Sequence, residues 1–217
     1  MRFYEKALMR ELEASSGERR ITAFLKRNAW LLVSAFSSDN NTFLVCPEFR
    51  FGNRFRADFV VLSGNSGEWN AHLIELEPVG DTFFISDGTD SKALRKAKKQ
   101  VGDWNHYIKN HPDDFREELF RSSCERNVFR SRLNYLFRYK NWTEEERKRA
   151  IYPHYHIVIG RRAALSSEDK ERRSWYYDYN RCQLITYDRF VNIASERDAN
   201  QREHEKRLKD YAAKHGL

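Results

Sequence analysis

The chain has 217 residues, and 39 lysine and arginine residues against 32 aspartate and glutamate residues give it a formal net charge of +7. This length predicts one domain, and an apolar fraction of 40% suffices for a core and argues against global disorder. The longest nearly apolar stretch, Ala29–Phe36, is far shorter than the ~20 residues of a spanning helix, so we expect no membrane partner. The N-terminus lacks the apolar segment of a secretory signal, and the cysteines are few and widely spaced, which together predict a cytoplasmic protein. The positive charge favours an anionic partner such as nucleic acid.

In the first half of the chain, apolar residues at helical spacing predict a helix from Glu11 to Phe36. Alternating apolar residues, separated by turn-forming residues, then predict three strands at residues 43–51, 54–62 and 71–77. A long helix is expected from Lys92 to Lys109, where apolar residues recur at three- and four-residue steps.

The rest of the chain is expected to contain a basic helical insertion at about residues 112–150, short buried strands at 156–160 and 182–187, and a charged C-terminal helix at about 195–217. This order of elements predicts an α/β fold in which helices flank a mixed β-sheet. We expect a single domain over residues 1–217, with its core at about 18–190.

Three acidic residues draw attention within the second and third predicted strands. Side chains alternate along a strand, so Asp58 shares a face with Val60, and Glu75 and Glu77 share a face with Leu73. If the loop at residues 63–70 closes symmetrically, the two strands pair Leu62 with Ala71, Val60 with Leu73 and Asp58 with Glu75. The hairpin therefore brings acid opposite acid at one end of an apolar face.

Like charges directly opposite each other destabilise an ordinary sheet, whereas a divalent cation would neutralise them. Oxygen ligands suit Mg²⁺ or Mn²⁺, so Asp58, Glu75 and Glu77 are candidate ligands of a metal that can promote phosphodiester cleavage. The alternative is an exposed edge face on which Glu77 pairs with Arg56 across the strands.

The helix at 92–109 adds residues that suit such a site. Gln100 would orient a water molecule or a carboxylate, and Lys96 lies one turn before it. The same helix carries a basic ridge, as a phosphate backbone would require, formed by Lys92, Arg95, Lys96, Lys98, Lys99 and Lys109. On the first predicted helix, Glu18 is a candidate for one more oxygen ligand; its alternative role is that of an ordinary acid in the first helical turn.

Asp58, the Glu75-Leu76-Glu77 segment and Gln100 together resemble the core motif of PD-(D/E)XK nucleases. More narrowly, the chain resembles the nuclease domain of the Shedu anti-phage family, in stretches that extend from about Glu18 to Phe190. The matching stretches are 56–60, 74–78, 97–104, 157–162 and 185–188. Because only the first residues and the tail lie outside them, we expect a stand-alone version of this domain.

The resemblance implies a restriction-endonuclease-like fold, bacterial immunity, metal-dependent cleavage of DNA and assembly into homo-oligomers. It implies that Asp58, Glu75 and Glu77 hold the metal and act in catalysis with Gln100. Glu77 stands where the broad nuclease pattern has lysine, so a third carboxylate would bind metal or act as base, or Lys96 would reach in from the helix. The DNA backbone is expected to contact Arg56, Lys92, Lys99 and Arg161.

Two other functions remain open at this point. One is a nuclease fold that has lost catalysis and binds DNA or a protein, which the glutamate at position 77 favours. The other is a metal-independent glycosidase that uses Glu75 and Glu77 as its carboxylate pair. His72 is predicted to lie on the face opposite the acids, and His154 and His156 offer poor metal geometry without a third ligand.

Overall fold

The computed structural model of the chain describes residues 3–14, 17–38, 41–65, 67–126, 128–129, 143–180 and 182–215. The helices in this part are α1 (Tyr4–Glu13), α2 (Glu18–Arg27), α3 (Trp30–Phe36), α4 (Lys92–Asn110), α5 (Pro112–Arg126), α7 (Glu144–Lys148), the 3-10 helix η1 (Arg162–Ala164), α8 (Ser167–Asn180) and α9 (Asp188–His215). The strands are β1 (Thr42–Phe51), β2 (Phe55–Asn65), β3 (Glu68–Leu76), β4 (Ile151–Val158) and β5 (Cys182–Ile185). Within the described ranges, no helix combines the length and the apolar character needed to cross a bilayer.

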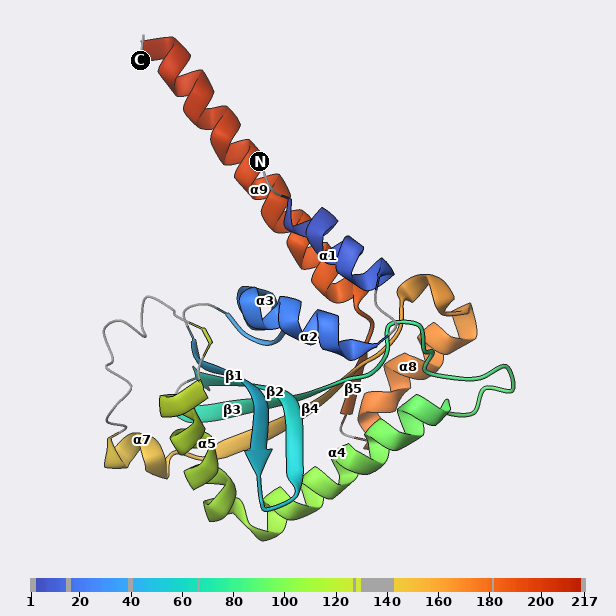
Figure 1. Ribbon diagram of the computed structural model, residues 1–217. Coiled ribbons are helices and arrows are strands. Elements are labelled where there is room, and N and C mark those ends of the chain that lie inside the picture. Colours follow the sequence, from blue (N-terminus) through green and yellow to red (C-terminus); the bar gives the residue numbers. More distant parts are fainter. Residues whose placement is uncertain are drawn as a thin grey trace.

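These strands form one five-stranded sheet in the order β1-β2-β3-β4-β5. The pairs β1–β2 and β2–β3 are antiparallel, whereas β3–β4 and β4–β5 are parallel. A parallel neighbour requires a crossover connection, and the chain that contains α4, α5 and α7 provides it between β3 and β4. This mixed sheet with helices around it (Figure 1) confirms the predicted α/β fold class.

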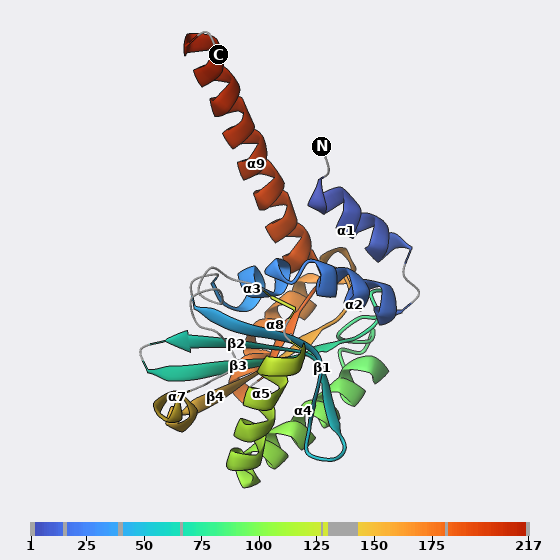
Figure 2. The same cartoon turned by 60° about the vertical axis from the view of Figure 1, so that its left-hand side comes forward.

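Helices cover both faces of the sheet, as the two views in Figures 1 and 2 show. On one face, Leu73 of β3 belongs to a buried cluster that includes Trp104 of α4 and residues of α5 and α8. On the other face, Ile74 belongs to a second cluster that includes Leu32 of α3 and residues of α1, α2 and α9. Successive residues of β3 therefore serve different layers, as the alternation of a strand requires.

The hairpin of β2 and β3 has the predicted register. Leu62 pairs with Ala71 and Val60 pairs with Leu73, and the ladder ends at the pair Phe59–Ile74. Asp58 and Glu75 lie one residue beyond this last pair, near the C-terminal end of the central strand β3. The pattern of apolar residues thus determined which face and which end of the hairpin carries the acids.

The N-terminal helical region differs from the prediction of one helix over residues 11–36. Asn28 interrupts it, because its backbone leaves the helical conformation and its side-chain amide donates a 2.9 Å hydrogen bond to the carbonyl of Phe24. The unpredicted helix α1 begins where the N–H groups of Tyr4 and Glu5 each donate a 3.0 Å hydrogen bond to the carboxylate of Asp198 on α9. That cap is a tertiary contact, which local spacing does not reveal.

Several boundaries also move. The strand predicted at 156–160 is β4, which begins at Ile151 because its parallel ladder with β3 starts there, opposite Trp69. The predicted C-terminal helix is confirmed, but α9 begins at Asp188 rather than near residue 195. Helices α5 and α7 lie within the predicted insertion, and residues 130–142 of that insertion lie outside the described residues.

Candidate functional site

Four carboxylates gather at the C-terminal end of the central strand β3, and we call them the acid cluster: Glu18, Asp58, Glu75 and Glu77. Asp58 lies near the start of β2, Glu75 is on β3 and Glu77 directly follows β3. The side chains of Glu75 and Glu77 are buried, with residue exposures of only 7% and 3%. Burying so many acids is costly unless protons or a cation compensate them.

Backbone hydrogen bonds hold the segment that carries two of these acids. The N–H of Leu76 donates a 2.8 Å hydrogen bond to Oδ2 of Asp58, which joins β3 to β2 beyond the end of the ladder. The N–H of Glu77 donates to the carbonyl of Val158 on β4 at 2.8 Å. The Tyr187 hydroxyl donates to the carbonyl of Glu77 at 2.7 Å. Hydrogen bonds to Asp58, Val158 and Tyr187 therefore hold the backbone of Leu76 and Glu77 in place.

The acids raise one another's pKa values. Burial, followed by the charges of Asp58 and Glu77, raises the pKa of Glu75 to about 9. Burial also raises the pKa of Asp58 to about 6, although the hydrogen bond from Leu76 opposes this shift. At neutral pH the cluster thus tends to retain a proton on Glu75, and a cation in its place would relieve the same repulsion.

Glu77 has a cationic neighbour on α4. Nζ of Lys96 lies 3.6 Å from Oε1 of Glu77, and this charge opposes the rise in the pKa of Glu77 that burial causes. The separation is too long for a hydrogen bond, so the buried Oε1 atom has no hydrogen-bond partner among the described residues. The alternative prediction that Glu77 forms an ion pair with Arg56 is wrong, because Glu77 pairs with Lys96 instead.

Glu18, the first residue of α2, also belongs to the cluster. Its charge raises the pKa values of Asp58, Glu75 and Glu77. The structure therefore brings together the three predicted metal ligands and the two additional candidates, Glu18 and Lys96.

The donor chemistry of the acid cluster suits a hard divalent cation, because it consists of carboxylate oxygens with an excess of negative charge. The unpartnered Oε1 of Glu77 offers one such oxygen. In the described part of the chain, however, no three His, Cys, Asp or Glu side chains already form a ligand shell around one point. The structure thus presents the donors without a closed coordination geometry.

A hollow of about 650 Å³ adjoins the cluster, and we call it the basic hollow. Its lining consists of Arg54, Phe55, Arg56, Lys96, Lys99, Gln100, Asp103 and Trp104. Four cationic side chains against one carboxylate make this surface suitable for a phosphate backbone. Lys96 belongs both to the hollow and to the ion pair with Glu77, so it joins the two features.

The remaining predicted residues divide into two groups. Gln100 lines the basic hollow, and its amide donates a 3.3 Å hydrogen bond to the carbonyl of Arg56 rather than to a carboxylate. Lys99 also lines the hollow and forms an ion pair with Asp103 at 2.9 Å. Lys92 is exposed at the start of α4, outside the lining of the hollow.

Arg161 lies apart from the other residues predicted to contact DNA. Its NH2 atom lies 3.0 Å from Oδ1 of Asp188, in an ion pair at the start of α9. The lining of the basic hollow, as far as the chain is described, does not include it. The structure therefore does not bring Arg161 to the acid cluster.

The histidines lie on the other face, as predicted for His72. The His72 ring stacks on His154 with 4.8 Å between centroids, and its Nδ1 lies 3.0 Å from Nε2 of His156. Burial lowers the pKa of His72 to about 4 and also lowers the pKa values of the other two. The rings of His72 and His156 also contact Phe36 on that side of the sheet.

Two residues at the site were not predicted. Tyr187 holds the carbonyl of Glu77, and only its position in a stretch shared with the resembled family pointed to it. Arg54 lines the basic hollow from the turn before β2, and its separation from Arg56 by one residue was the available signal.

A comparison with protein families supplies an independent observation. The family model described as the C-terminal part of the Shedu protein SduA matches residues 15–191. This range contains the acid cluster, the basic hollow and all five strands. A search of curated proteins finds no match.

Proposed function

Because the chain belongs to the Shedu family, which is associated with anti-phage defence, we propose that it is a DNA endonuclease dependent on a divalent cation. The observation that carries this proposal is the position of Lys96, which lies 3.6 Å from Glu77 while it lines the basic hollow. Lys96 thus connects a surface that suits a phosphate backbone to the four clustered carboxylates. Such a juxtaposition has a clear use in phosphodiester cleavage and little use in a purely structural region.

In this proposal Asp58, Glu75 and Glu77 would hold Mg²⁺ or Mn²⁺. When bound, the cation supplies Lewis-acid stabilisation of the charge that develops on the phosphodiester. The raised pKa values of Asp58 and Glu75 fit this role, because a cation would release the proton that repulsion now keeps on the cluster. Glu18 is an additional oxygen donor on the same side.

The chain's own residues would position the DNA. The phosphate backbone binds along the basic hollow to Arg54, Arg56 and Lys99. Lys96 binds the phosphate group that lies nearest to Glu77. Gln100 holds the backbone of Arg56 and so supports the floor of the hollow. Lys96 also supplies the positive charge that the lysine of the broader nuclease pattern would provide, since Glu77 occupies that position.

The proposal is tested by plasmid cleavage with Mg²⁺ or Mn²⁺. The wild-type chain should nick or linearise DNA, and Glu75→Ala should lower the rate at least 100-fold. The matched control is Glu68→Ala, which removes an exposed glutamate at the far end of the same strand and should leave cleavage unchanged. Absence of metal-dependent cleavage on supercoiled, linear and single-stranded DNA would refute the enzyme hypothesis.

A second candidate is a catalytically inactive module that binds DNA or a protein partner. Two observations favour it: glutamate replaces the usual lysine at position 77, and no closed group of three ligands exists among the described side chains. In that case DNA binding would survive Asp58→Ala with an unchanged salt dependence, because phosphate contacts determine the slope. Loss of cleavage in Asp58→Ala, with binding retained, would instead support the enzyme.

A further inference from the structure

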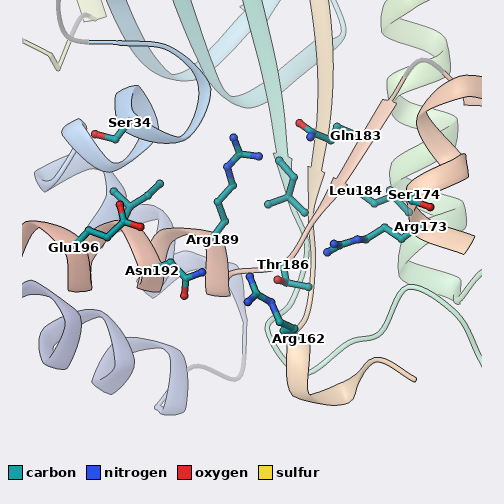
Figure 3. A pocket seen from close by; sticks show the side chains of 12 residues that line it. Ser34, Arg162, Arg173, Ser174, Gln183, Leu184, Thr186, Arg189, Asn192 and Glu196 are labelled. Carbon is teal, nitrogen blue, oxygen red and sulfur yellow. The ribbon is translucent and has the colours of Figure 1, made fainter. Parts of the chain in front are cut away.

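A second pocket lies at the outer edge of the sheet, beside β5, and we call it the arginine pocket. Its volume is about 530 Å³, and its wall is formed by α3, η1, α8, β5 and α9. Three of its lining residues are arginines: Arg162, Arg173 and Arg189. In Figure 3 the side chains of Arg162 and Arg173 extend into the space between α8 and α9, with Thr186 between them.

Among the described residues, the guanidinium groups of these three arginines form no ion pair, although Glu196 lines the same pocket. By contrast, the neighbouring Arg161 is paired with Asp188. Arg189 instead donates to the carbonyl of Ala35 and lies over the ring of Phe36, so α3 holds its guanidinium group, which points away from Arg162 and Arg173 in Figure 3.

Two of these arginines, Arg162 and Arg173, are also close enough to repel one another. Arg173 is half-buried, and burial together with the charge of Arg162 lowers its pKa. Burial lowers the pKa of Arg189 as well. An anion in the pocket would relieve this repulsion, and it would find planar donors that can bind two oxygens at once.

The charge and size of the pocket narrow the class of anion. Three arginines against Glu196 leave an excess of two positive charges, which matches a phosphate monoester at neutral pH better than a carboxylate. A volume of about 530 Å³ exceeds what a bare phosphate needs and lies in the range of small-molecule sites. Neutral hydrogen-bonding side chains, those of Ser34, Gln183 and Asn192, line the remaining wall (Figure 3).

We propose that the arginine pocket binds the phosphate group of a small phosphate monoester of about mononucleotide size. The site is distinct from the acid cluster, which lies where β3 ends, because β4 and β5 separate the two. One path connects them: Thr186 lines the pocket, and the next residue, Tyr187, donates its hydroxyl hydrogen bond to Glu77. Binding of the phosphate monoester depends only on the residues of the arginine pocket, so this proposal does not require that the chain cleaves DNA.

Isothermal titration calorimetry at constant ionic strength tests the proposal with AMP, inorganic phosphate and adenosine. AMP should bind, inorganic phosphate should compete with it, and adenosine should not bind. The double variant Arg162→Gln/Arg173→Gln should weaken AMP binding at least 10-fold. Arg207→Gln removes an exposed arginine far along α9 and should leave the affinity within twofold of wild type.

The single variant Arg162→Gln, whose side chain is exposed, should bind AMP several-fold more weakly even if the double variant does not fold. Three results would overturn the proposal. One is no binding of AMP or phosphate by the wild-type chain, and another is undiminished binding by a folded double variant, which would assign the ligand to the basic hollow. The third is binding of a 5′-phosphorylated oligonucleotide but not of AMP, which would make DNA rather than a small ester the ligand.

Discussion

The hydroxyl of Tyr187 donates a 2.7 Å hydrogen bond to the backbone carbonyl of Glu77, 110 positions earlier in the chain. Both residues are buried, and Tyr187 directly precedes α9. The bond therefore attaches the C-terminal part of the fold to the acid that pairs with Lys96. Because the carbonyl follows the last residue of β3, this bond fixes the backbone from which the Glu77 side chain extends.

Replacing Tyr187 by phenylalanine removes only this hydroxyl. We expect the free energy of unfolding to fall by about 1–2 kcal/mol, since a buried carbonyl loses its donor. Metal-dependent cleavage should fall about 10-fold or more if the position of Glu77 matters. Urea unfolding and plasmid cleavage measure the two effects.

Tyr155 supplies the matched control. Its hydroxyl is also buried but has no hydrogen-bond partner among the described residues, so Tyr155→Phe should change stability by less than about 0.5 kcal/mol or increase it. Equal losses of stability and cleavage in the two variants would contradict a specific role for the Tyr187–Glu77 bond.

The raised pKa of Glu75 makes the stability of the metal-free protein depend on pH. The pKa is about 9 in the folded state against an ordinary value of 4.5, so the folded state binds the extra proton between these values. The free energy of unfolding therefore falls as pH rises from about 4.5 towards 9. Glu75→Gln removes this dependence and should stabilise the metal-free protein by about 2 kcal/mol at pH 7.

Urea unfolding in EDTA at pH 5, 7 and 8.5 measures this effect. The difference between Glu75→Gln and wild type should grow with pH, whereas Glu68→Gln, at an exposed position of the same strand, should show a constant difference. Added Mn²⁺ should narrow the gap by stabilising the wild type alone. A difference that stays flat with pH would mean that Glu75 is already ionised in the folded protein.

The histidines on the other face predict an effect of opposite sign. Burial lowers the pKa of His72 to about 4 from 6.5, so the unfolded state binds more protons between these values. Stability is therefore retained above about pH 6.5 and lost as pH falls towards 4. His72→Phe should reduce the loss between pH 7 and 4.5 by about 2 kcal/mol. Unfolding of His204→Gln, at an exposed position on α9, should keep the wild-type pH dependence.

Lys96 allows DNA binding and the acid cluster to be tested together. Lys96→Gln removes one phosphate contact in the basic hollow, so the slope of log affinity against log salt should fall by ~0.9 for duplex DNA. It also removes the charge that opposes the raised pKa of Glu77, so the variant should need a higher pH for cleavage. Lys109 of the predicted basic ridge lies at the exposed far end of α4, outside the lining of the basic hollow, so Lys109→Gln should leave both properties unchanged. An unaltered salt slope in Lys96→Gln would exclude Lys96 from the DNA contact.

The pairing of β2 with β3 and the face that carries the acids follow from local sequence patterns. A strand repeats every two residues, so the positions of Val60 and Leu73 dictate that Asp58 and Glu75 share the layer covered by α4. The long amphipathic pattern of α4 likewise located Lys96 and Gln100 on that layer. These inferences succeed because they depend only on the geometry of one strand or one helix.

Which charged side chains contact one another depends instead on the packing of elements that lie far apart in the chain. The break at Asn28, the approach of Glu18 to the acids and the pairing of Glu77 with Lys96 rather than Arg56 depend on how separate elements pack. The arginine pocket draws Arg162, Arg173 and Arg189 from three helices that have no common periodicity in the sequence. The pKa shifts follow the same rule, because burial, their first cause, is a property of the assembled layers and not of any local pattern.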